Sequence, residues 1–483
     1  MSTPQFTEPK DTWLHFVGVG GSGMSALAQY HAARGGRVTG SDRAFDRDLH
    51  SDIRGFLERA GVEIVQQDGD GIGASCRGVV VSTAVEDSVP DVKRARELGL
   101  PLIHRAELLA RYVAERETVA VTGTSGKSTV TGMLFEILHH AGLEPSVLTG
   151  GDLVFLREHG QLGNAWAGRG SVLVIEADES DGSLVHYEPW LGVLMNLQRD
   201  HKEPEELAEI FHAFRRRTRG PFVVGEYENL DPFADDSLRY GIGRRKGQWL
   251  DILATKIDCG PRGSRFEVEG VSFEIPVPGL HNVENALAAI AAIRGLDLPL
   301  EAAAVGLSRF RGIVRRFQTV GTPCGVEVVD DFGHNPAKIA ATLQAARRRG
   351  GRVLAAFQPH GFRPTAFIRK ELVSMLAQEL RPEDRFWILD IFYAGGTAER
   401  TVTSEEIVAD AVALGAPVLH APNRDTLKAA ITSEARQGDV VIVMGARDPS
   451  LTTLAKDVAN AIESRGPSRA LNVPRAGARR AER

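Results

Sequence analysis

The sequence predicts an α/β protein of three domains, and three observations lead to this prediction. The chain has 483 residues, too long for one ordinary hydrophobic core, so about two to four domains are expected. Short apolar runs alternate with helical stretches in the first and last parts of the chain, as in parallel sheets covered by helices. A glycine-rich loop between a strand and a helix opens a separate central block. We expect domains over residues 1–115, 116–319 and 320–465, followed by a flexible tail over 466–483.

The first domain is expected to be Rossmann-like. Apolar, β-branched runs predict strands over Trp13–Val19, Arg37–Gly40 and Arg77–Ser82. Helices are predicted over Gly23–Arg34 and Asp91–Leu98.

The central domain is expected to resemble a P-loop ATPase. Strands are predicted over Thr118–Val121, Val172–Ile175 and Gly192–Asn196, with a helix over Ser128–His140 and an Ala-rich helix after His281.

The C-terminal domain alternates again and is expected to be Rossmann-like. Its predicted strands are Val326–Asp330, Arg352–Phe357, Arg385–Leu389 and Val440–Met444, and its predicted helices are Pro336–Arg349 and Thr365–Glu379.

Composition and charge narrow the class of protein. The net charge is −6 and the basic residues are scattered, which argues against nucleic acid as a partner. Cys76, Cys259 and Cys324 form no short pair and are expected to be reduced thiols. The first residues lack the apolar core of a signal peptide, and no apolar run approaches the roughly 20 residues that cross a bilayer. We expect a soluble cytoplasmic protein, a monomer or weak homodimer.

The segment TGTSGKST, residues 122–129, follows a strand and opens a helix, which is the context of a phosphate-binding loop. Glycines let backbone N–H groups turn towards phosphate oxygens, Lys127 would bind the β- and γ-phosphates, and Ser128 would coordinate Mg²⁺. Only two residues separate Gly123 from Gly126, fewer than in the common P-loop. The candidate phosphate-binding residues are Gly123, Thr124, Ser125, Gly126, Lys127, Ser128 and Thr129.

A second glycine-rich loop, GVGGSG at Gly18–Gly23, also joins a strand to a helix. Asp42 ends the next predicted strand, where an acidic side chain can accept hydrogen bonds from ribose hydroxyls. By itself this pattern suggests a nicotinamide cofactor. It favours binding of a diphosphate without identifying the nucleotide.

Acidic residues follow the strands of the central block. The run Glu176–Asp181 (EADESD) ends one predicted strand, and Asp200-His201 follows the next. Carboxylates at the carboxyl edge of a sheet, beside a phosphate loop, are suited to holding Mg²⁺, and His201 is a candidate second ligand.

Taken together, these motifs resemble those of the Mur ligase family, in the family's order and over nearly the whole chain. Gly18–Ser25 and Gly40–Asp42 are most similar to the branch that adds L-alanine. The motifs that carry the resemblance are the shortened phosphate loop, the acidic run, Asp200-His201, Gly279–Ala286 (GLHNVENA), Arg315–Phe317, Asp330–His334 and Phe357–His360.

The resemblance implies an enzyme that uses ATP and Mg²⁺ to join an amino acid to the carboxylate of UDP-N-acetylmuramate through an acyl phosphate. The first domain would bind the UDP-sugar, the central one ATP, and the last the amino acid. The implied UDP-sugar residues are Gly18, Gly20, Gly21, Ser22, Gly23, Met24, Asp42 and Ser82. The implied residues around adenine and ribose are His281, Asn282, Asn285, Arg316 and Asp331. The implied Mg²⁺ ligands are Ser128, Glu176 and His201.

The amino-acid region departs from the family pattern. Gly361–Pro364 (GFRP) stands where the family has Arg-Tyr-Thr-Arg, so Arg363 is our candidate for the carboxylate of the amino acid. Either His334 or His360 would position or deprotonate the attacking amine. Asn335 replaces a second histidine. Because of these differences, the sequence does not identify which amino acid is the substrate.

Three alternatives remain at this stage. A paralogous Mur ligase could attach another amino acid or a recycled peptide. A nicotinamide-dependent oxidoreductase would use Gly18–Gly23, and a P-loop nucleotide switch would use ATP without ligating.

Overall fold

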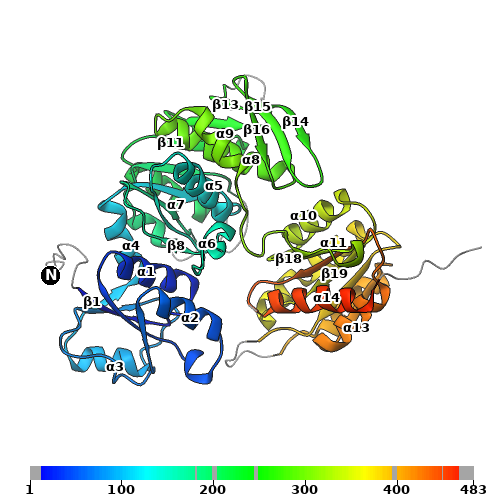
Figure 1. Ribbon diagram of the computed structural model, residues 1–483, viewed down its shortest axis with the longest axis horizontal. Helices are drawn as coiled ribbons and strands as arrows, with labels where there is room; N and C mark the ends of the chain where they lie inside the picture. Colours follow the sequence, from blue (N-terminus) through cyan, green and yellow to red (C-terminus); the bar gives the residue numbers. More distant parts are fainter. Residues whose placement is uncertain are drawn as a thin grey trace, which may run out of the picture. The chain divides into compact units, whose positions relative to one another are not determined.

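The computed structural model describes residues 12–179, 182–197, 204–243, 249–393, 400–448 and 450–466. It confirms the predicted α/β class, with parallel sheets between helices (Figure 1). The chain divides into two compact units, Met1–Val314 and Arg315–Arg483. The first unit therefore contains both of the first two predicted blocks, and the division falls five residues before the expected boundary between 319 and 320.

The first sheet has five parallel strands in the order β3-β2-β1-β4-β5. Its residues alternate between two apolar layers: Phe16 packs with α1 and α4, and Val17 packs towards α3. The strands are β1 Trp13–Val17, β2 Arg37–Ser41, β3 Val62–Val65, β4 Gly78–Val81 and β5 Leu102–His104. The helices are α1 Ser22–Ala33, α2 Ser51–Arg59, α3 Pro90–Glu97 and α4 Arg105–Ala114.

The second sheet has eight strands in the order β13-β12-β11-β10-β6-β9-β7-β8. Val119 and Val121 of β6 face α5 and α8, whereas Ala120 faces the layer that contains Phe211 and Phe214 of α7. The strands are β6 Glu117–Thr122, β7 Ser146–Leu148, β8 Ala165–Trp166, β9 Val172–Glu176, β10 Leu191–Leu194, β11 Phe222–Gly225, β12 Leu238–Gly241 and β13 Ile252–Leu253. The helices are α5 Lys127–His140, α6 Val154–Glu158, α7 Pro204–Arg217, α8 Leu280–Gly295 and α9 Leu300–Ser308.

A small antiparallel sheet in the same unit had not been predicted. It consists of β14 Thr255–Cys259, β15 Ser264–Val268 and β16 Val271–Ile275. Phe266 and Phe273 stack across β15 and β16 and are fully buried. Each strand has only five residues, too few for the alternation of apolar and polar residues to stand out from the surrounding sequence.

The second unit contains a six-stranded sheet in the order β17-β18-β22-β19-β20-β21, in which only β17 pairs antiparallel. Helices cover both faces: Val329 packs towards α10 and α11, and Val328 towards α14. The strands are β17 Gln318–Gly321, β18 Glu327–Asp331, β19 Val353–Phe357, β20 Arg385–Leu389, β21 Val418–Ala421 and β22 Val440–Met444. The helices are α10 Pro336–Arg348, α11 Phe362–Glu379, α12 Ser404–Ala413, α13 Arg424–Glu434 and α14 Leu451–Arg465.

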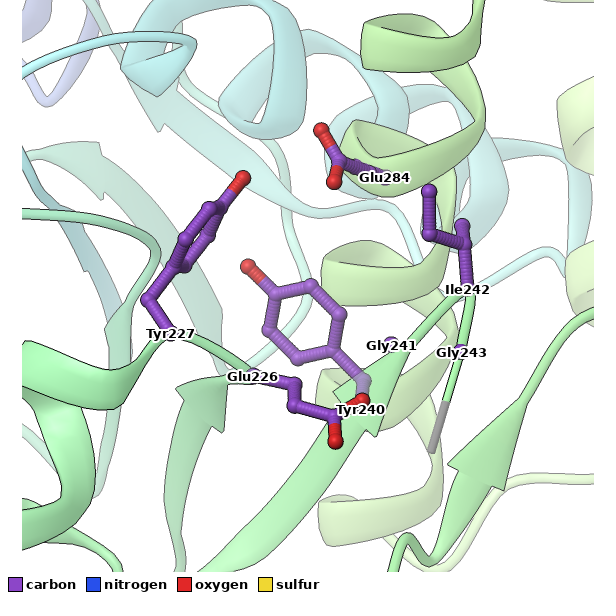
Figure 2. A pocket seen from close by; sticks show the side chains of 7 residues that line it. All are labelled: Glu226, Tyr227, Tyr240, Gly241, Ile242, Gly243 and Glu284. Atoms are coloured by element: carbon purple, nitrogen blue, oxygen red, sulfur yellow. The ribbon is translucent and has the colours of Figure 1, made fainter. Parts of the chain in front are cut away.

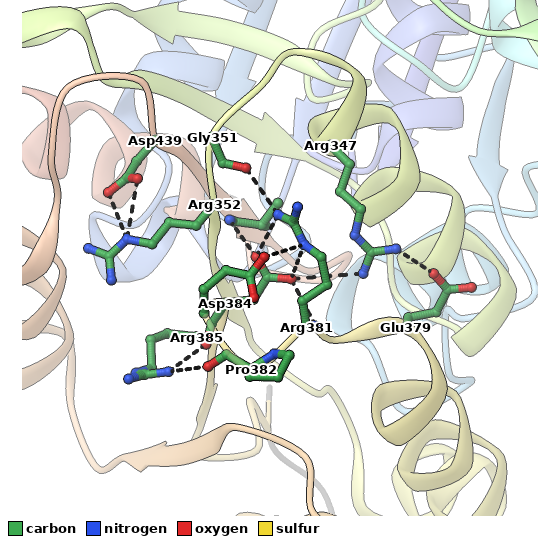
Figure 3. Close-up of polar contacts among 11 residues, drawn as sticks. Arg347, Gly351, Arg352, Glu379, Arg381, Pro382, Asp384, Arg385 and Asp439 are labelled. Carbon is green, nitrogen blue, oxygen red and sulfur yellow. Dashed lines mark hydrogen bonds and ion pairs between the residues drawn. The ribbon is translucent and has the colours of Figure 1, made fainter.

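The amino ends of β19 and β20 are held by a cluster of arginines and carboxylates (Figure 3). The fully buried Asp384 accepts hydrogen bonds from the backbone N–H of Val353 at 2.8 Å and from the Arg381 guanidinium at 3.0 Å. Burial opposes ionisation, but these hydrogen bonds outweigh it and hold the pKa of Asp384 below its usual value. The cluster therefore stabilises the edge of this sheet opposite to the one where ligands bind in open α/β folds.

Candidate active site

Three neighbouring parallel strands of the second sheet bring the polar residues of the central block together. The phosphate loop follows β6, Glu176 ends β9, and Asn196 follows β10; β6 pairs with both other strands. Because the carboxyl ends of parallel strands meet at one edge, residues separated by about 50 to 70 positions become neighbours.

The glycines of the phosphate loop are required by their surroundings. Gly126 precedes α5 with φ = 87°, and a Cβ atom there would lie 2.5 Å from the Asn285 amide oxygen and 2.6 Å from Met195 Cε. Gly123 has φ = 133°, and its Cβ would lie 3.1 Å from the backbone of Asn196. The loop therefore fits between β10 and α8 only without side chains at these two positions.

Asn196 fixes the conformation of the loop. Its side-chain oxygen accepts hydrogen bonds from the Thr124 hydroxyl and the Ser125 N–H, both at 2.9 Å, and its amide donates to the Ser125 carbonyl at 3.0 Å. The sequence predicts Asn196 as the last residue of a strand and assigns it no role. A polar residue directly after a buried strand was the available signal.

Lys127 lies in an acidic environment. Its ammonium donates to Glu179 Oε2 at 2.7 Å and to the Gly123 carbonyl at 2.8 Å, and Asp178 lies 3.9 Å away. Burial acts to lower the pKa of Lys127, but these carboxylates raise it above the usual value, so the side chain is a cation at neutral pH. Burial also raises the pKa of Glu179.

The Glu176 carboxylate is held by three donors. Its Oε2 accepts hydrogen bonds from the Ser128 and Thr149 hydroxyls at 2.9 and 2.8 Å and from the Gly150 N–H at 2.8 Å. A hydroxyl and a carboxylate at the start of a phosphate loop are oxygen ligands of the kind that Mg²⁺ prefers, so Ser128 and Glu176 fit the expected metal. His201, the third expected ligand, lies outside the described residues, as do Ser180, Asp181 and Asp200.

Helix α8 places the expected nucleotide residues beside the loop. Asn285 is buried against Gly126 and donates to Asn282 at 3.2 Å, while His281 is exposed at the start of the helix. The neighbouring Glu284 faces the other way, into a pocket of about 280 Å³ between the ends of β11 and β12. The pocket is lined by Glu226, Tyr227, Tyr240, Gly241, Ile242, Gly243 and Glu284 (Figure 2).

Burial favours the neutral forms of three polar side chains in this pocket. Burial raises the pKa of Tyr227 and Tyr240, and the carboxylate of Glu284 raises both further. Burial also raises the pKa of Glu284, which forms a hydrogen bond with Tyr227. Tyr227 and Glu284 point towards one another across the opening (Figure 2). The pocket thus presents hydroxyl and carboxyl groups that can form hydrogen bonds with a polar molecule.

In the first sheet, the glycine loop Gly18–Gly23 follows β1 and leads into α1, as expected. Asp42 is engaged by backbone: it accepts from the N–H groups of Gly20 at 3.0 Å and Ala44 at 2.8 Å. Met24 is buried in α1, and Ser82 follows β4 and is half-buried. The Arg105 guanidinium occupies the space that a side chain at Gly23 would fill. A cation therefore lies beside the loop, which the sequence does not predict.

The second unit contains the remaining candidates. Asp331 is buried and accepts hydrogen bonds from the N–H groups of Gly333 and Phe317, both at 2.8 Å. Arg316 is exposed, with its guanidinium 4.9 Å from the ring of Phe332. All of these contacts lie within the second unit.

Two histidines of the second unit lie together. The ring centroids of His334 and His360 are 5.8 Å apart. Burial lowers the pKa of His334 to about 4, with the nearby Lys338 and Arg316 adding to the effect, so its imidazole is neutral at pH 7. Arg363 is exposed in the first turn of α11, three residues after His360.

Comparison with known proteins gives matches over most of the chain. Residues 14–117, 121–293 and 315–447 match the profiles described as Mur ligase family catalytic domain, Mur ligase middle domain, and Mur ligase glutamate ligase domain. The UDP-N-acetylmuramate–L-alanine ligase of Pelobacter propionicus is 35% identical over 460 residues, which are 90% of this chain and 95% of that protein. The chain belongs to the Mur ligase family. The enzyme of the same name from Mycolicibacterium smegmatis is 34% identical to this Mur ligase and covers 91% of it, with 93% of its own length matched.

Solved structures agree with the fold of this Mur ligase. The UDP-N-acetylmuramate–alanine ligase of Thermotoga maritima superposes with a TM-score of 0.78 at 26% identity, covering 94% of this chain and 99% of that one. A murein peptide ligase from Psychrobacter arcticus shares the fold, with a TM-score of 0.68 at 24% identity over 94% of this chain and 99% of its own. Within the described part of this Mur ligase, no helix is long and apolar enough to cross a membrane.

Proposed function

We propose that this Mur ligase uses ATP to join an amino acid, L-alanine, to the carboxylate of UDP-N-acetylmuramate in the synthesis of peptidoglycan precursors. The names of the relatives support this substrate pair. The observation that carries the proposal is the convergence of Lys127, Ser128 and Glu176 at the carboxyl edge of the second sheet. We also propose that the reaction takes place in the cytoplasm, where ATP is available, and that the protein is a monomer or weak homodimer.

The phosphate loop and Lys127 bind the phosphates of ATP, and the UDP-sugar carboxylate attacks the γ-phosphorus. This step forms an acyl phosphate and ADP, which gives the carboxyl carbon a good leaving group. Ser128 and Glu176, with His201, would hold Mg²⁺, which supplies positive charge to the transferring phosphoryl group. The cation of Lys127 stabilises the same charge, and the loop N–H groups orient the phosphates.

The nucleoside end of ATP fits beside α8. Asn285 packs against Gly126, and the pocket of Tyr227, Tyr240 and Glu284 lies along the same sheet edge. Adenine carries hydrogen-bonding groups on a planar ring, and the hydroxyl and carboxyl groups of this pocket can pair with them. We assign the pocket to this end of the nucleotide.

The amino acid enters from the second unit. Its neutral amine attacks the acyl carbon, and phosphate leaves from the tetrahedral intermediate. We assign positioning of the amine to the neutral imidazole of His334 together with His360, which lies beside it. The exposed Arg363 would bind the carboxylate.

The deciding experiment measures phosphate release with ATP, Mg²⁺ and UDP-N-acetylmuramate against the twenty amino acids. L-Alanine-dependent release with formation of the amide product is the expected result. Phosphate release that occurs with a peptide but with no single amino acid would favour the paralogous ligase. The differences from the family pattern at Gly361–Pro364 are compatible with that alternative. Phosphate release without any amino-acid dependence would favour a nucleotide switch, and NADH binding at Gly18–Gly23 would favour an oxidoreductase.

A further inference from the structure

Asn164 is a buried polar residue at the contact between the first and second sheets. It immediately precedes β8 and is 1% exposed. Its side-chain amide donates to the Ser22 carbonyl and to the Ser25 hydroxyl, both at 2.8 Å, and its oxygen accepts from Gln29 at 2.9 Å. Ser22, Ser25 and Gln29 lie on one face of α1. Asn164 thus binds the helix that begins at the glycine loop.

The backbone of Asn164 connects to the phosphate site. Its carbonyl accepts a hydrogen bond from the Thr149 N–H at 3.0 Å. The Thr149 hydroxyl donates to Glu176 Oε2 at 2.8 Å, and the same oxygen accepts from Ser128. A continuous series of hydrogen bonds therefore runs from the first turn of α1 to the first turn of α5.

Apolar side chains also pack at this contact. Met24 and Leu27 of α1 share one hydrophobic core with Leu148 and Ala165 of the second sheet and with Leu162, which lies shortly before β8. Apolar packing tolerates small sliding movements, whereas a buried amide loses hydrogen bonds as soon as its partners shift. Both the amide N–H groups and the amide oxygen of Asn164 have hydrogen-bond partners on α1. These bonds form together in only one position of α1 against β7 and β8.

We propose that Asn164 is a positioning residue that sets the separation between the glycine loop and the phosphate site. The proposal rests on the proposed function, in which the UDP-sugar is bound at the first site and ATP at the second. The sugar carboxylate must approach the γ-phosphorus to about 3 to 3.5 Å in line, and small displacements of such reactants cost large factors in rate. Asn164 acts on the approach of two bound substrates, without touching either.

The test replaces Asn164 by its isostere. Asn164→Asp keeps the shape but turns a donor towards the Ser22 carbonyl into an acceptor, so α1 must shift. We expect kcat to fall by about 10- to 100-fold, while the dissociation constants of ATP and of UDP-N-acetylmuramate, each measured alone by calorimetry, change by less than about threefold. Leu162→Ala is the control: it removes apolar contact in the same core and leaves every hydrogen bond of Asn164 in place.

Unchanged kcat in Asn164→Asp, an equal loss of kcat in Leu162→Ala, or weakened binding of either substrate would overturn the proposal. If Asn164→Asp does not fold, Gln29→Leu removes one of the three hydrogen bonds to α1 and is expected to lower kcat by about three- to tenfold with the same unchanged binding.

Hydrogen exchange separates this proposal from the proposed function. Asn164→Asp should speed amide exchange in both α1 and the β7–β8 segment, and Leu162→Ala should do so less. Unaltered protein that makes no amide with any amino acid would refute the proposed function, whatever the exchange result. Exchange equal to that of the unaltered protein would refute the positioning role even in an active enzyme.

Discussion

Lys127 Nζ lies 2.7 Å from Glu179 Oε2, so this carboxylate takes one of the three N–H donors that the ammonium can offer to phosphate oxygens. Glu179 is 4% exposed and Lys127 is largely buried, so water screens their attraction only weakly. ATP must therefore compete with a carboxylate of the protein for the lysine that binds its phosphates.

Neutralising that competitor should strengthen nucleotide binding. We expect Glu179→Gln to lower the KM for ATP by about threefold or more, because the phosphates then meet one negative charge fewer. Asp178→Asn, whose carboxylate is 3.9 Å from the same ammonium, serves as the matched control with a smaller effect. Initial rates against ATP concentration test this, and a higher KM in Glu179→Gln would contradict it.

Lys127→Ala should reduce ligation by about a hundredfold or more, because it removes a preorganised cation from the transferring phosphoryl group. Binding of UDP-N-acetylmuramate should be nearly unaffected, since Gly18–Gly23 belongs to another sheet. Calorimetry with the UDP-sugar checks this, with the exposed Lys456→Ala as control. A collapse of UDP-sugar affinity would refute the two-site assignment.

Glu176→Gln and His201→Ala should each lower kcat more than they raise the KM for ATP, because a metal ligand stabilises the transition state more than the ground state. Both variants should also need more Mg²⁺ than the millimolar range expected for the unaltered enzyme. Rates measured over a Mg²⁺ titration test this, with the exposed Glu463→Gln as control. Unchanged kcat in both variants would remove these residues from the metal site.

Arg363→Lys should raise the KM for the amino acid before it affects ATP, because a single ammonium replaces a bidentate guanidinium. The exposed Arg348→Lys provides a control in the same unit. Gly361 also removes a side chain from the expected pocket wall, so L-serine or glycine should be accepted besides L-alanine. An unchanged amino-acid KM, or L-alanine preferred by more than about a hundredfold in kcat/KM (about 2.7 kcal/mol), would argue against this pocket.

The buried Glu136 of α5 should make stability depend on pH. Burial raises its pKa from 4.5 to about 8, and its oxygens accept from the Arg311 N–H at 3.2 and 3.3 Å. Between these two pH values the folded state holds a proton that the unfolded state has released, so stability falls as pH rises. Glu136→Gln should therefore be more stable than the unaltered protein near pH 9, by about a few kcal/mol at most, and no more stable near pH 5. Urea titrations at both pH values, with the exposed Glu301→Gln as control, measure the difference.

Much of the fold followed from local sequence. Strands such as Arg385–Leu389 and Val440–Met444 have the predicted bounds, because continuous apolar runs of this length occur where both faces of a parallel sheet are covered. The phosphate loop was also recognisable, since its glycines, Lys127 and Ser128 are consecutive.

Contacts over long separations were not predictable in the same way. Asn196 bonds to Thr124 across 72 positions, and Asn164 bonds to Gln29 across 135. Asn196 carries only the weak signal of a polar residue after a buried strand, and Asn164 carries none, because their hydrogen-bond partners come together only when two strands or two sheets meet. The pairing of Lys127 with Glu179 was missed for the same reason, although both residues lie in motifs that had been singled out.

The contact between Gly126 and Asn285 limits how this enzyme can evolve. Any residue with a Cβ at 126 would collide with the Asn285 amide oxygen, and it would be strained by φ = 87° even if that amide moved away. A cell exposed to an inhibitor that fits over the loop would therefore gain no resistance from a single substitution at position 126. Resistance would have to arise at residues whose side chains can change size, and inhibitors that contact only the Gly126 backbone and α8 would offer the fewest such routes.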